Sequence, residues 1–487
     1  MRRLTPQNLA HAHPAVRRYS YDRGSVTPGI VHLGIGAFHR AHEAVYVDDI
    51  LEMDPSWGIV GASLRRPDTK EALEPQDGLY CVLVRDASGS VPRVIGSVLE
   101  VIDATTEGDR LLELMASPEV RIVSLTVTEK GYCHDPATGH LDRGHPDIVH
   151  DLENPEQPRS APGFVVEALD RRRRAGLAPF TVMSCDNLPS NGRTAQRIIG
   201  EFAKARDEQL AAYVAGVAFP CTMVDRIVPA TTDADREAAA EALGLDDAWP
   251  VVTEPFTQWV IEDRFSAGRP NFEAVGAQVV DEVEPFEHMK LRMLNGSHST
   301  LAYLGYLAGY QYVADAIGDA AFRRLIHGLM TEEVIPTLSM PETDLEGYRD
   351  ALLERFANPA LKHRTWQIAM DGSQKLPQRL LGTIRDRIAA GRSYERLALG
   401  VAGWMRYASG VDEQGGAIDV RDPMAARFAA ISSAAGGDAE RLVEGFLGLQ
   451  EVFGTDLPAD GAFREMLVML LGHLLGEGSA ATVARIG

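Results

Sequence analysis

Two different patterns of apolar residues divide the chain. From about residue 29 to about residue 280, short runs rich in β-branched residues alternate with stretches of helical spacing, and polar or glycine-containing turns follow the runs. Strands that alternate with helices predict a parallel, doubly wound sheet. The strands are expected at residues 30–34, 58–64, 120–127, 180–184 and 213–218.

After about residue 286 the pattern changes to the three- and four-residue spacing of amphipathic helices. The sequence therefore predicts an α/β domain over residues 1–284 and a mainly α-helical domain over residues 285–487. No flexible linker marks the boundary between Glu284 and Pro285. The long helices are expected at residues 289–312, 320–338, 344–356, 394–409 and 441–452.

Composition and charge narrow the class of protein. The 487 residues carry 48 Lys plus Arg against 69 Asp plus Glu, a formal charge of −21, which disfavours nucleic acid or an anionic membrane as a partner. The apolar runs are shorter than the roughly 20 residues that cross a bilayer, and the basic start lacks the apolar core of a secretory signal. We expect a reduced, cytoplasmic protein, because the four cysteines stand in unrelated segments: Cys81, Cys133, Cys185 and Cys221.

The segment of residues 30–42 has the form of a nucleotide-binding turn. An apolar strand runs into Gly34 and Gly36, which allow a tight turn and a close approach of the backbone to a pyrophosphate. His39 takes the place of a third glycine, and G-x-G alone also fits an ordinary strand-to-helix turn. A helix at residues 42–51 and the strand at residues 58–64 complete a β–α–β unit that favours the dinucleotide.

The residues just after the second strand bear on the choice of cofactor. The carboxylate of Asp68 could bind a ribose 2′-hydroxyl, whereas Arg65 and Arg66 could hold the 2′-phosphate of NADP. We favour NAD, and NADP stays open. The predicted cofactor-binding residues are Gly34, Gly36, Phe38, Arg40, Arg65 and Asp68.

Residues 287–298 combine groups that suit proton transfer to or from an alcohol. At about 100° per residue, Asn295 and His298 lie about 140° and 80° around a helix from Lys290, so the three can line one broad face. Lysine has an unperturbed pKa of about 10.4, and burial beside other cations can bring it toward 7 or 8, where it can accept a proton. An ordinary amphipathic helix with an exposed lysine is the alternative. The cations near Lys290 in sequence are His288, Arg292 and His298.

Polar residues also follow three strands of the first half. Glu129, Asp186 with Asn187, and Asp225 with Arg226 stand where open α/β sheets bind ligands, outside the carboxyl ends of their strands. Each alone could be a helix cap, but three at one edge of a sheet favour a common cleft. The chain has no Tyr-x-x-x-Lys, G-x-S-x-G, Walker A or Cys/His zinc set. Hydride transfer assisted by lysine, without a metal, is the chemistry that these residues favour.

Five ordered motifs resemble the mannitol dehydrogenase family, also called the polyol-specific long-chain dehydrogenases and reductases. They lie at residues 34–42, 181–192, 223–226, 290–298 and 371–375. The resemblance implies a Rossmann-type domain, a helical substrate domain, and an NAD(P)-dependent, metal-independent interconversion of a secondary alcohol with a ketose. It implies Lys290 as general base, Asn187 and Asn295 as the oxyanion pair, and Glu287, with Glu129, as the carboxylate that relays the proton to solvent. It further implies Asp225, His298 and Lys375 as contacts of the substrate hydroxyls, and a monomer.

One departure from the family concerns the substrate. The best-known mannitol dehydrogenases carry an arginine where this chain has Gln367. Residues 365–375 of this chain look more like the fructuronate reductase branch of the family. A hexuronate or aldonate carboxylate would need a cation, for which Arg364, Lys375 and Arg379 are candidates. The mannitol/fructose pair stays open as the substrate. A non-catalytic dinucleotide or sugar sensor that keeps the fold is the alternative from another class.

Overall fold

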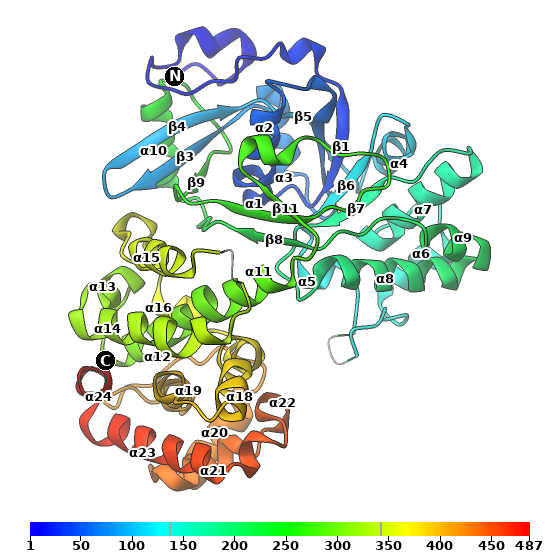
Figure 1. Cartoon of the computed structure of the whole chain (residues 1–487). Coiled ribbons are helices and arrows are strands. Elements are labelled where there is room, and N and C mark those ends of the chain that lie inside the picture. Colours follow the sequence, from blue (N-terminus) through cyan, green and yellow to red (C-terminus); the bar gives the residue numbers. More distant parts are fainter. Residues whose placement is uncertain (136–137, 341–342) are drawn as a thin grey trace. The chain divides into compact units, whose positions relative to one another are not determined.

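The computed structural model describes residues 1–135, 138–340 and 343–487. Its chain divides into two compact units, Met1–Glu284 and Pro285–Gly487, each with its own apolar core (Figure 1). The first unit contains the strands and the second is built from helices, as the sequence pattern predicts. Each unit is described by itself below.

A parallel sheet with the strand order β5-β2-β1-β6-β7 forms the centre of the first unit, which confirms the Rossmann-type prediction. Its side chains alternate between two cores. Val31, Val123 and Val182 pack on one face, and Ile30, Ile122 and Met183 on the other, because successive strand residues point to opposite faces. The strands are β1 (Pro28–Leu33), β2 (Gly58–Ser63), β5 (Val98–Asp103), β6 (Ile122–Leu125) and β7 (Thr181–Ser184).

Helices cover both faces of this sheet, with α7 packing on α4 and α8 (Figure 1). Helix α2 belongs to the opposite core, through Ala44, Val47 and Ile50. The helices are α1 (Ala37–Ala41), α2 (Glu43–Ile50), α3 (Asp68–Leu73), α4 (Gly108–Ala116), α5 (Thr128–Gly131), α6 (Pro146–Glu153), α7 (Ala161–Arg174), α8 (Asn191–Arg206), α9 (Glu208–Val214) and α10 (Asp233–Leu243).

The predicted strand at residues 213–218 is wrong. Those residues form the end of α9 and a turn, because Leu210, Val214 and Val217 recur at helical spacing and bury one side against the sheet. The strand lies a few residues later, at β8 (Thr222–Asp225). It belongs to a smaller sheet, β11-β10-β8, that the sequence pattern did not predict, and a further sheet has the order β4-β3-β9. Their strands are β3 (Tyr80–Asp86), β4 (Gly89–Ile95), β9 (Val251–Thr253), β10 (Gln258–Glu262) and β11 (Gln278–Val280).

Helix α12 (Gly296–Leu307) is the central element of the second unit. It is buried along most of its length and packs on α16 (Thr365–Ala369) and α19 (Glu395–Ala408). The other helices are α11 (Glu284–Met289), α13 (Val313–Gly318), α14 (Ala320–Gly328), α15 (Leu345–Phe356), α17 (Gly372–Leu376), α18 (Gly382–Ala389), α20 (Ala425–Ala435), α21 (Ala439–Leu447), α22 (Gln450–Phe453), α23 (Gly461–Glu477) and α24 (Ser479–Ile486).

Among the described residues, three π-helical turns interrupt these helices, and two of them, at residues 290–295 and 329–334, lie where the sequence predicts uniform α-helix. The three turns are η6 (Lys290–Asn295), η7 (Leu329–Val334) and η10 (Pro377–Leu381). A π turn closes its hydrogen bonds over five residues instead of four, and such turns are frequent at functional sites. Two of the three, η6 and η10, contact each other and carry or adjoin predicted site residues.

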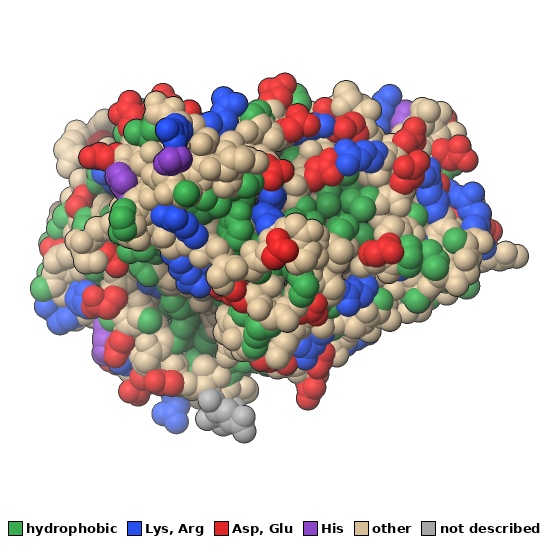
Figure 2. Space-filling model, turned by 90° about the horizontal axis from the view of Figure 1, so that it is seen from above, with side chains coloured by type: hydrophobic (Ala, Val, Ile, Leu, Met, Phe, Trp, Pro, Cys, Tyr) green, Lys and Arg blue, Asp and Glu red, His purple; other side chains and the backbone are tan. Residues whose placement is uncertain are grey.

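Charged side chains of both signs are exposed on the surface, as expected from the charged composition of the chain. On the face seen in Figure 2, Lys and Arg side chains are intermingled with Asp and Glu side chains. In the described ranges, no helix is long and apolar enough to cross a membrane. The four cysteines are buried free thiols.

Candidate active site

The turn after β1 is built on two glycines with different requirements. Gly34 has φ +94°, and a Cβ there would lie 2.4 Å from the carbonyl oxygen of Thr126, so only glycine fits. Gly36 has an ordinary backbone conformation, and a Cβ there would meet nothing nearer than the carbonyl oxygen of Gly34 at 3.7 Å. The fold therefore does not require glycine at position 36, whereas a ligand that approaches this backbone closely would.

The side chains of two other predicted cofactor-binding residues, Phe38 and Arg40, contact neighbouring protein groups. The half-buried ring of Phe38 stacks on His42 at 5.0 Å. Arg40 is buried, donates a hydrogen bond to the carbonyl oxygen of Trp249 and lies over the ring of Tyr80. The guanidinium of Arg40 therefore faces the interior of the unit, and its contact with a cofactor stays a prediction.

The residues after β2 are exposed. Asp68 begins α3, and its carboxylate accepts the backbone N–H of Thr69, at 3.2 Å. Arg65 forms an ion pair with Asp147 at 2.6 Å. A 2′-phosphate would have to compete with Asp147 for Arg65, whereas a ribose hydroxyl would meet Asp68 without such competition. The pairing of Arg65 favours NAD over NADP, whereas Arg66, the other candidate for a 2′-phosphate, is exposed.

A buried polar cluster lies under the turn. His32, His39 and Glu43 bring ligand atoms within 4.8 Å of one another, and the two imidazoles stack at 3.5 Å. Both ring nitrogens of His32 are already hydrogen-bonded, to Ser124 at 2.8 Å and Thr126 at 2.7 Å. The hydroxyl of Thr126 in turn donates to the carbonyl oxygen of Gly34. His32 therefore ties the turn to β6, whereas the buried ring nitrogens of His39 and the carboxylate oxygens of Glu43 have no hydrogen-bond partner among the described residues.

A second group with possible metal ligands contains Cys133, His145 and Asp147. Asp147 is engaged by Arg65, and the ring of His145 accepts the backbone N–H of Asp147 at 3.2 Å. Burial raises the pKa of the Cys133 thiol to about 12, which disfavours the thiolate that binds metals. Asp147 and His145 therefore make contacts that hold the local structure around residues 145–147.

Asp186 connects the carboxyl ends of β6 and β7. Its carboxylate accepts the backbone N–H groups of Thr128 at 2.8 Å and Val127 at 3.1 Å, and the hydroxyl of Tyr132 at 2.8 Å. Burial raises the pKa of this carboxyl, and these three hydrogen bonds oppose the rise. Thr128 has φ +64°, a costly conformation for a β-branched residue, which Asp186 holds in place. Sequence analysis places Asp186 at the correct edge of the sheet but does not reveal this clamp.

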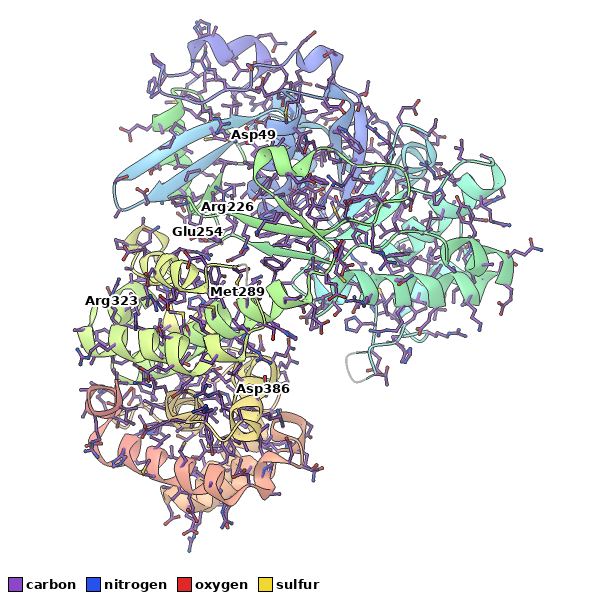
Figure 3. The ribbon with its side chains drawn as sticks, in the orientation of Figure 1. Asp49, Arg226, Glu254, Met289, Arg323 and Asp386 are labelled. Atoms are coloured by element: carbon purple, nitrogen blue, oxygen red, sulfur yellow. The ribbon has the colours of Figure 1, made fainter. Side chains whose placement is uncertain are left out.

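The predicted site residues at this edge are held by the same framework. Asn187 follows Asp186 and is exposed, Glu129 is exposed just after the strained Thr128, and Asp225 is buried at the end of β8. The side chain of Asn191 ties β8 to the turn after β7, through Thr222 and the carbonyl oxygen of Asp186. Arg226, beside Asp225, donates twice to the carbonyl oxygen of Glu254 (Figure 3). The structure thus brings the ends of β6, β7 and β8 together.

Replacing Asp186 with asparagine is expected to lower kcat by about 10²-fold, since a displacement of about 1 Å in a reacting group has that effect. An amide oxygen can accept one of the two backbone N–H bonds, and the other, part-buried donor loses its partner, at a cost toward the lower end of about 1–3 kcal/mol. Steady-state kinetics and thermal unfolding measure both effects. Tyr132→Phe, which keeps both backbone bonds, is the graded control, and an equal loss of activity in the two variants would contradict the role given to the carboxylate.

In the second unit, the π turn η6 changes how the lysine motif is arranged. In an α-helix, Asn295 would lie about 140° around the axis from Lys290. Hydrogen bonds closed over five residues instead place Asn295 about one turn above Lys290, and His298 follows three residues later in α12. All three are buried, with 8 %, 9 % and 8 % of their surface exposed. The turn begins directly after Met289, labelled in Figure 3.

Three charged or titratable neighbours of Lys290 lie on the same segment: Glu287, His288 and Arg292. Glu287, one turn before Lys290, is half-buried. Arg292 pairs with Asp386, which is labelled in Figure 3, at 2.6 Å and donates to Thr337 at 2.9 Å, and His288 is exposed. The sequence predicts Arg292 as a candidate cationic neighbour of Lys290, and its pairing shows that Asp386 compensates its charge.

His298 lies among aromatic and basic side chains. Its ring stacks on Phe356 at 5.2 Å and meets the ring of His363 at 4.8 Å. Burial holds the pKa of His298 well below its usual value, and the nearby His363, Arg379, Arg355 and Lys375 lower it further. His298 is therefore a neutral imidazole, which can donate a hydrogen bond from one nitrogen and accept at the other.

The remaining predicted substrate contacts lie around the segment from α16 to η10. Lys375 donates to the carbonyl oxygens of Met370 at 2.5 Å and Ile368 at 3.3 Å, and burial together with Arg379 lowers its pKa to about 8. Gln367 is exposed, and Arg364 is an exposed residue at the start of α16. The buried amide nitrogen of Asn295 has no hydrogen-bond partner among the described residues, so it is available to a ligand.

Known proteins similar to this chain agree with this division. Residues 28–274 match the family model of the mannitol dehydrogenase Rossmann domain, and residues 282–474 match that of the mannitol dehydrogenase C-terminal domain. The chain is 51 % identical over 493 residues to D-mannonate oxidoreductase of Escherichia coli (strain K12), with 100 % of each covered. The structure of Pseudomonas fluorescens mannitol 2-dehydrogenase in ternary complex with NAD and D-mannitol matches with a TM-score of 0.86 and 40 % identity, covering 99 % of each chain.

A third similar protein is D-sorbitol dehydrogenase in substrate-free form, whose structure matches with a TM-score of 0.92 and 38 % identity. That match covers 99 % of this chain and 100 % of the other. Full-length similarity at these levels, together with both family models, shows that this chain belongs to the mannitol dehydrogenase family.

Proposed function

We propose that this chain is an NAD-dependent oxidoreductase that interconverts the secondary alcohol of an aldonate, of the D-mannonate/D-fructuronate type, with the ketone. The observation that carries the proposal is the π turn η6, which aligns Lys290, Asn295 and His298 on one buried face in a chain of the mannitol dehydrogenase family. An amine, an amide and an imidazole on one face suit proton transfer to or from an alcohol hydroxyl.

The first unit would hold the dinucleotide at the turn of Gly34 and Gly36, with Asp68 on the ribose. The open space at the Gly36 Cα supports this fit, since a pyrophosphate needs that closeness. When bound, NAD would supply the acceptor for the hydride that leaves the hydroxyl-bearing carbon of the substrate. NADH would supply the donor for the reverse reaction at the ketone carbon. The dinucleotide-binding role of residues 1–284 and the substrate-binding role of residues 285–487 belong to this proposal.

Each substrate-facing residue has one task. Lys290 takes the hydroxyl proton when the alcohol is oxidised and returns it when the ketone is reduced, without a metal ion. Asn187 and Asn295 donate to the developing alkoxide, and charge-directed donors of this kind contribute several kcal/mol. Glu287, with Glu129, passes the proton of Lys290 to solvent. Asp225, His298 and Lys375 bind the other hydroxyls of the substrate.

An aldonate is favoured over a neutral polyol by two observations. D-mannonate oxidoreductase is 51 % identical to this chain, whereas mannitol 2-dehydrogenase of known structure is 40 % identical. The surroundings of His298 are also rich in positive charge, from Arg355, Lys375 and Arg379. Gln367 in place of the arginine of mannitol dehydrogenases agrees with a different substrate.

The test follows the absorbance of NADH and NADPH with the purified protein. We expect reduction of D-fructuronate with NADH to exceed reduction of D-fructose by at least about tenfold, the effect of about 1.4 kcal/mol, and NADH to be preferred over NADPH. Inactivity with every polyol, ketose and uronate tried, together with intact NADH binding, would favour the sensor instead. Gel filtration and fractionation test the monomeric state and the cytoplasmic location that we also propose.

A further inference from the structure

Arg379 lies beside the proposed catalytic helix. It belongs to the π turn η10, and one of its terminal nitrogens donates to the hydroxyl of Ser299, the residue after His298, at 3.0 Å. The two helices touch here, because a Cβ on Gly296 would lie 2.7 Å from the carbonyl oxygen of Arg379. Because Gly296 has no side chain, η10 can pack closely against the start of α12, and the guanidinium of Arg379 reaches Ser299.

The charge of Arg379 has no carboxylate partner among the residues that the structure describes. Its contact with Ser299 engages one of the five N–H donors of a guanidinium. Burial lowers the pKa of Arg379, and Tyr303 is the group that opposes this. By contrast, Arg292 on η6 pairs with Asp386, and Arg385 on α18 pairs with Asp456 at 2.6 Å. A partly buried cation without a counter-ion is costly, unless an anionic ligand supplies one.

Two other cations of this region, Lys375 and Arg364, are less suited to an anion. Lys375 already donates to two backbone carbonyl oxygens. Arg364 is exposed, which weakens a charge pair by solvation. Arg379 offers a planar fork that matches a carboxylate in two parallel hydrogen bonds.

We propose that Arg379 binds the carboxylate of the substrate and thereby selects an aldonate or uronate over a neutral polyol. This inference rests on the proposed function, because it assigns the charged end of the substrate to the surroundings of Ser299, the residue after His298. Arg379 acts on binding and specificity, and the proton and hydride steps stay with the groups named above.

The test compares D-mannonate with its uncharged amide, D-mannonamide, in the wild type and in Arg379→Gln. In the wild type we expect kcat/KM for the carboxylate to exceed that for the amide by about 10- to 100-fold, the range expected of charge-assisted hydrogen bonds. Arg379→Gln should abolish this difference by raising KM for D-mannonate, with kcat nearly unchanged. Arg379→Lys should restore part of the preference, and Arg385→Gln, six residues further along the chain in α18, should keep all of it.

Several results would overturn the inference. One is an Arg379→Gln variant that keeps the full preference for the carboxylate, and another is an equal loss for both substrates, which would indicate a structural role. A wild type that shows no preference for the carboxylate over the amide would also overturn the inference. If Arg379→Gln does not fold, Arg379→Lys with an unchanged preference and an unchanged KM decides against it. A wild type inactive with all substrates would contradict the proposed function itself.

Discussion

Replacing Lys290 with methionine is expected to reduce kcat for alcohol oxidation and ketone reduction by about 10²- to 10⁴-fold, the contribution of a positioned general acid–base group. The loss should exceed that caused by any contact of the substrate hydroxyls, because Lys290 alone handles the reacting proton in the proposed mechanism. Methionine keeps the length and most of the volume of this buried side chain, so we expect the packing around it to survive.

The measurement is steady-state kinetics, accompanied by NADH titration and thermal unfolding. NADH affinity should stay within a few-fold of the wild type, since the dinucleotide turn belongs to the first unit. Lys204→Met, which changes an exposed lysine at the end of α8, serves as the matched control and should retain full activity. More than a tenth of the wild-type kcat in the Lys290 variant would mean that another group moves the proton.

Replacing Gly34 with alanine is expected to destroy dinucleotide binding and to destabilise the first unit. Alanine at φ +94° is strained, and its Cβ would also lie 2.4 Å from the carbonyl oxygen of Thr126 and 2.8 Å from the carbonyl carbon. Because those atoms belong to the backbone beside the central strands, relief requires β1 and β6 to move apart at this end. We expect a loss of more than about 1 kcal/mol in the free energy of unfolding and no measurable NADH binding.

Gly36→Ala separates the fold from the ligand at the same turn. Its Cβ would meet no protein atom closer than 3.7 Å, so we expect the free energy of unfolding to change by less than about 1 kcal/mol. NADH affinity should nevertheless fall by about tenfold or more, because the methyl group would occupy the space that a pyrophosphate needs. Gly176→Ala, at φ +69° with nothing within 4 Å, gives the cost of the backbone conformation alone. Unchanged NADH affinity in Gly36→Ala would place the dinucleotide elsewhere.

The local features of the dinucleotide turn and the lysine motif could be predicted from sequence. A strand that ends in Gly34 and Gly36 has few conformations open to it, and the structure places the turn there. The alternation of strands and helices likewise predicts the parallel sheet, since each element needs only its own apolar pattern to be recognised. Residues 213–218 show the limit, because a short apolar run with helical neighbours fits both periods.

Contacts between distant residues could not be predicted in this way. Arg40 follows the glycine turn directly, yet its guanidinium is bound by the carbonyl oxygen of Trp249, 209 residues further along the chain. Arg65 is a plausible phosphate ligand until Asp147 is found at 2.6 Å. The roles of such residues depend on which partner the fold brings to them.

The sequence by itself determined the two halves of this protein, the glycine turn and the identity of the lysine, asparagine and histidine on one helical segment. It did so because backbone preference and apolar period are local properties. Only the tertiary structure decided that a π turn aligns Lys290 with Asn295, that Asp186 clamps the strained Thr128, and that Arg379 lacks a counter-ion beside His298 among the described residues. Hydrogen-bond register, clamping and charge compensation depend on groups far apart in the chain, and packing alone brings them together.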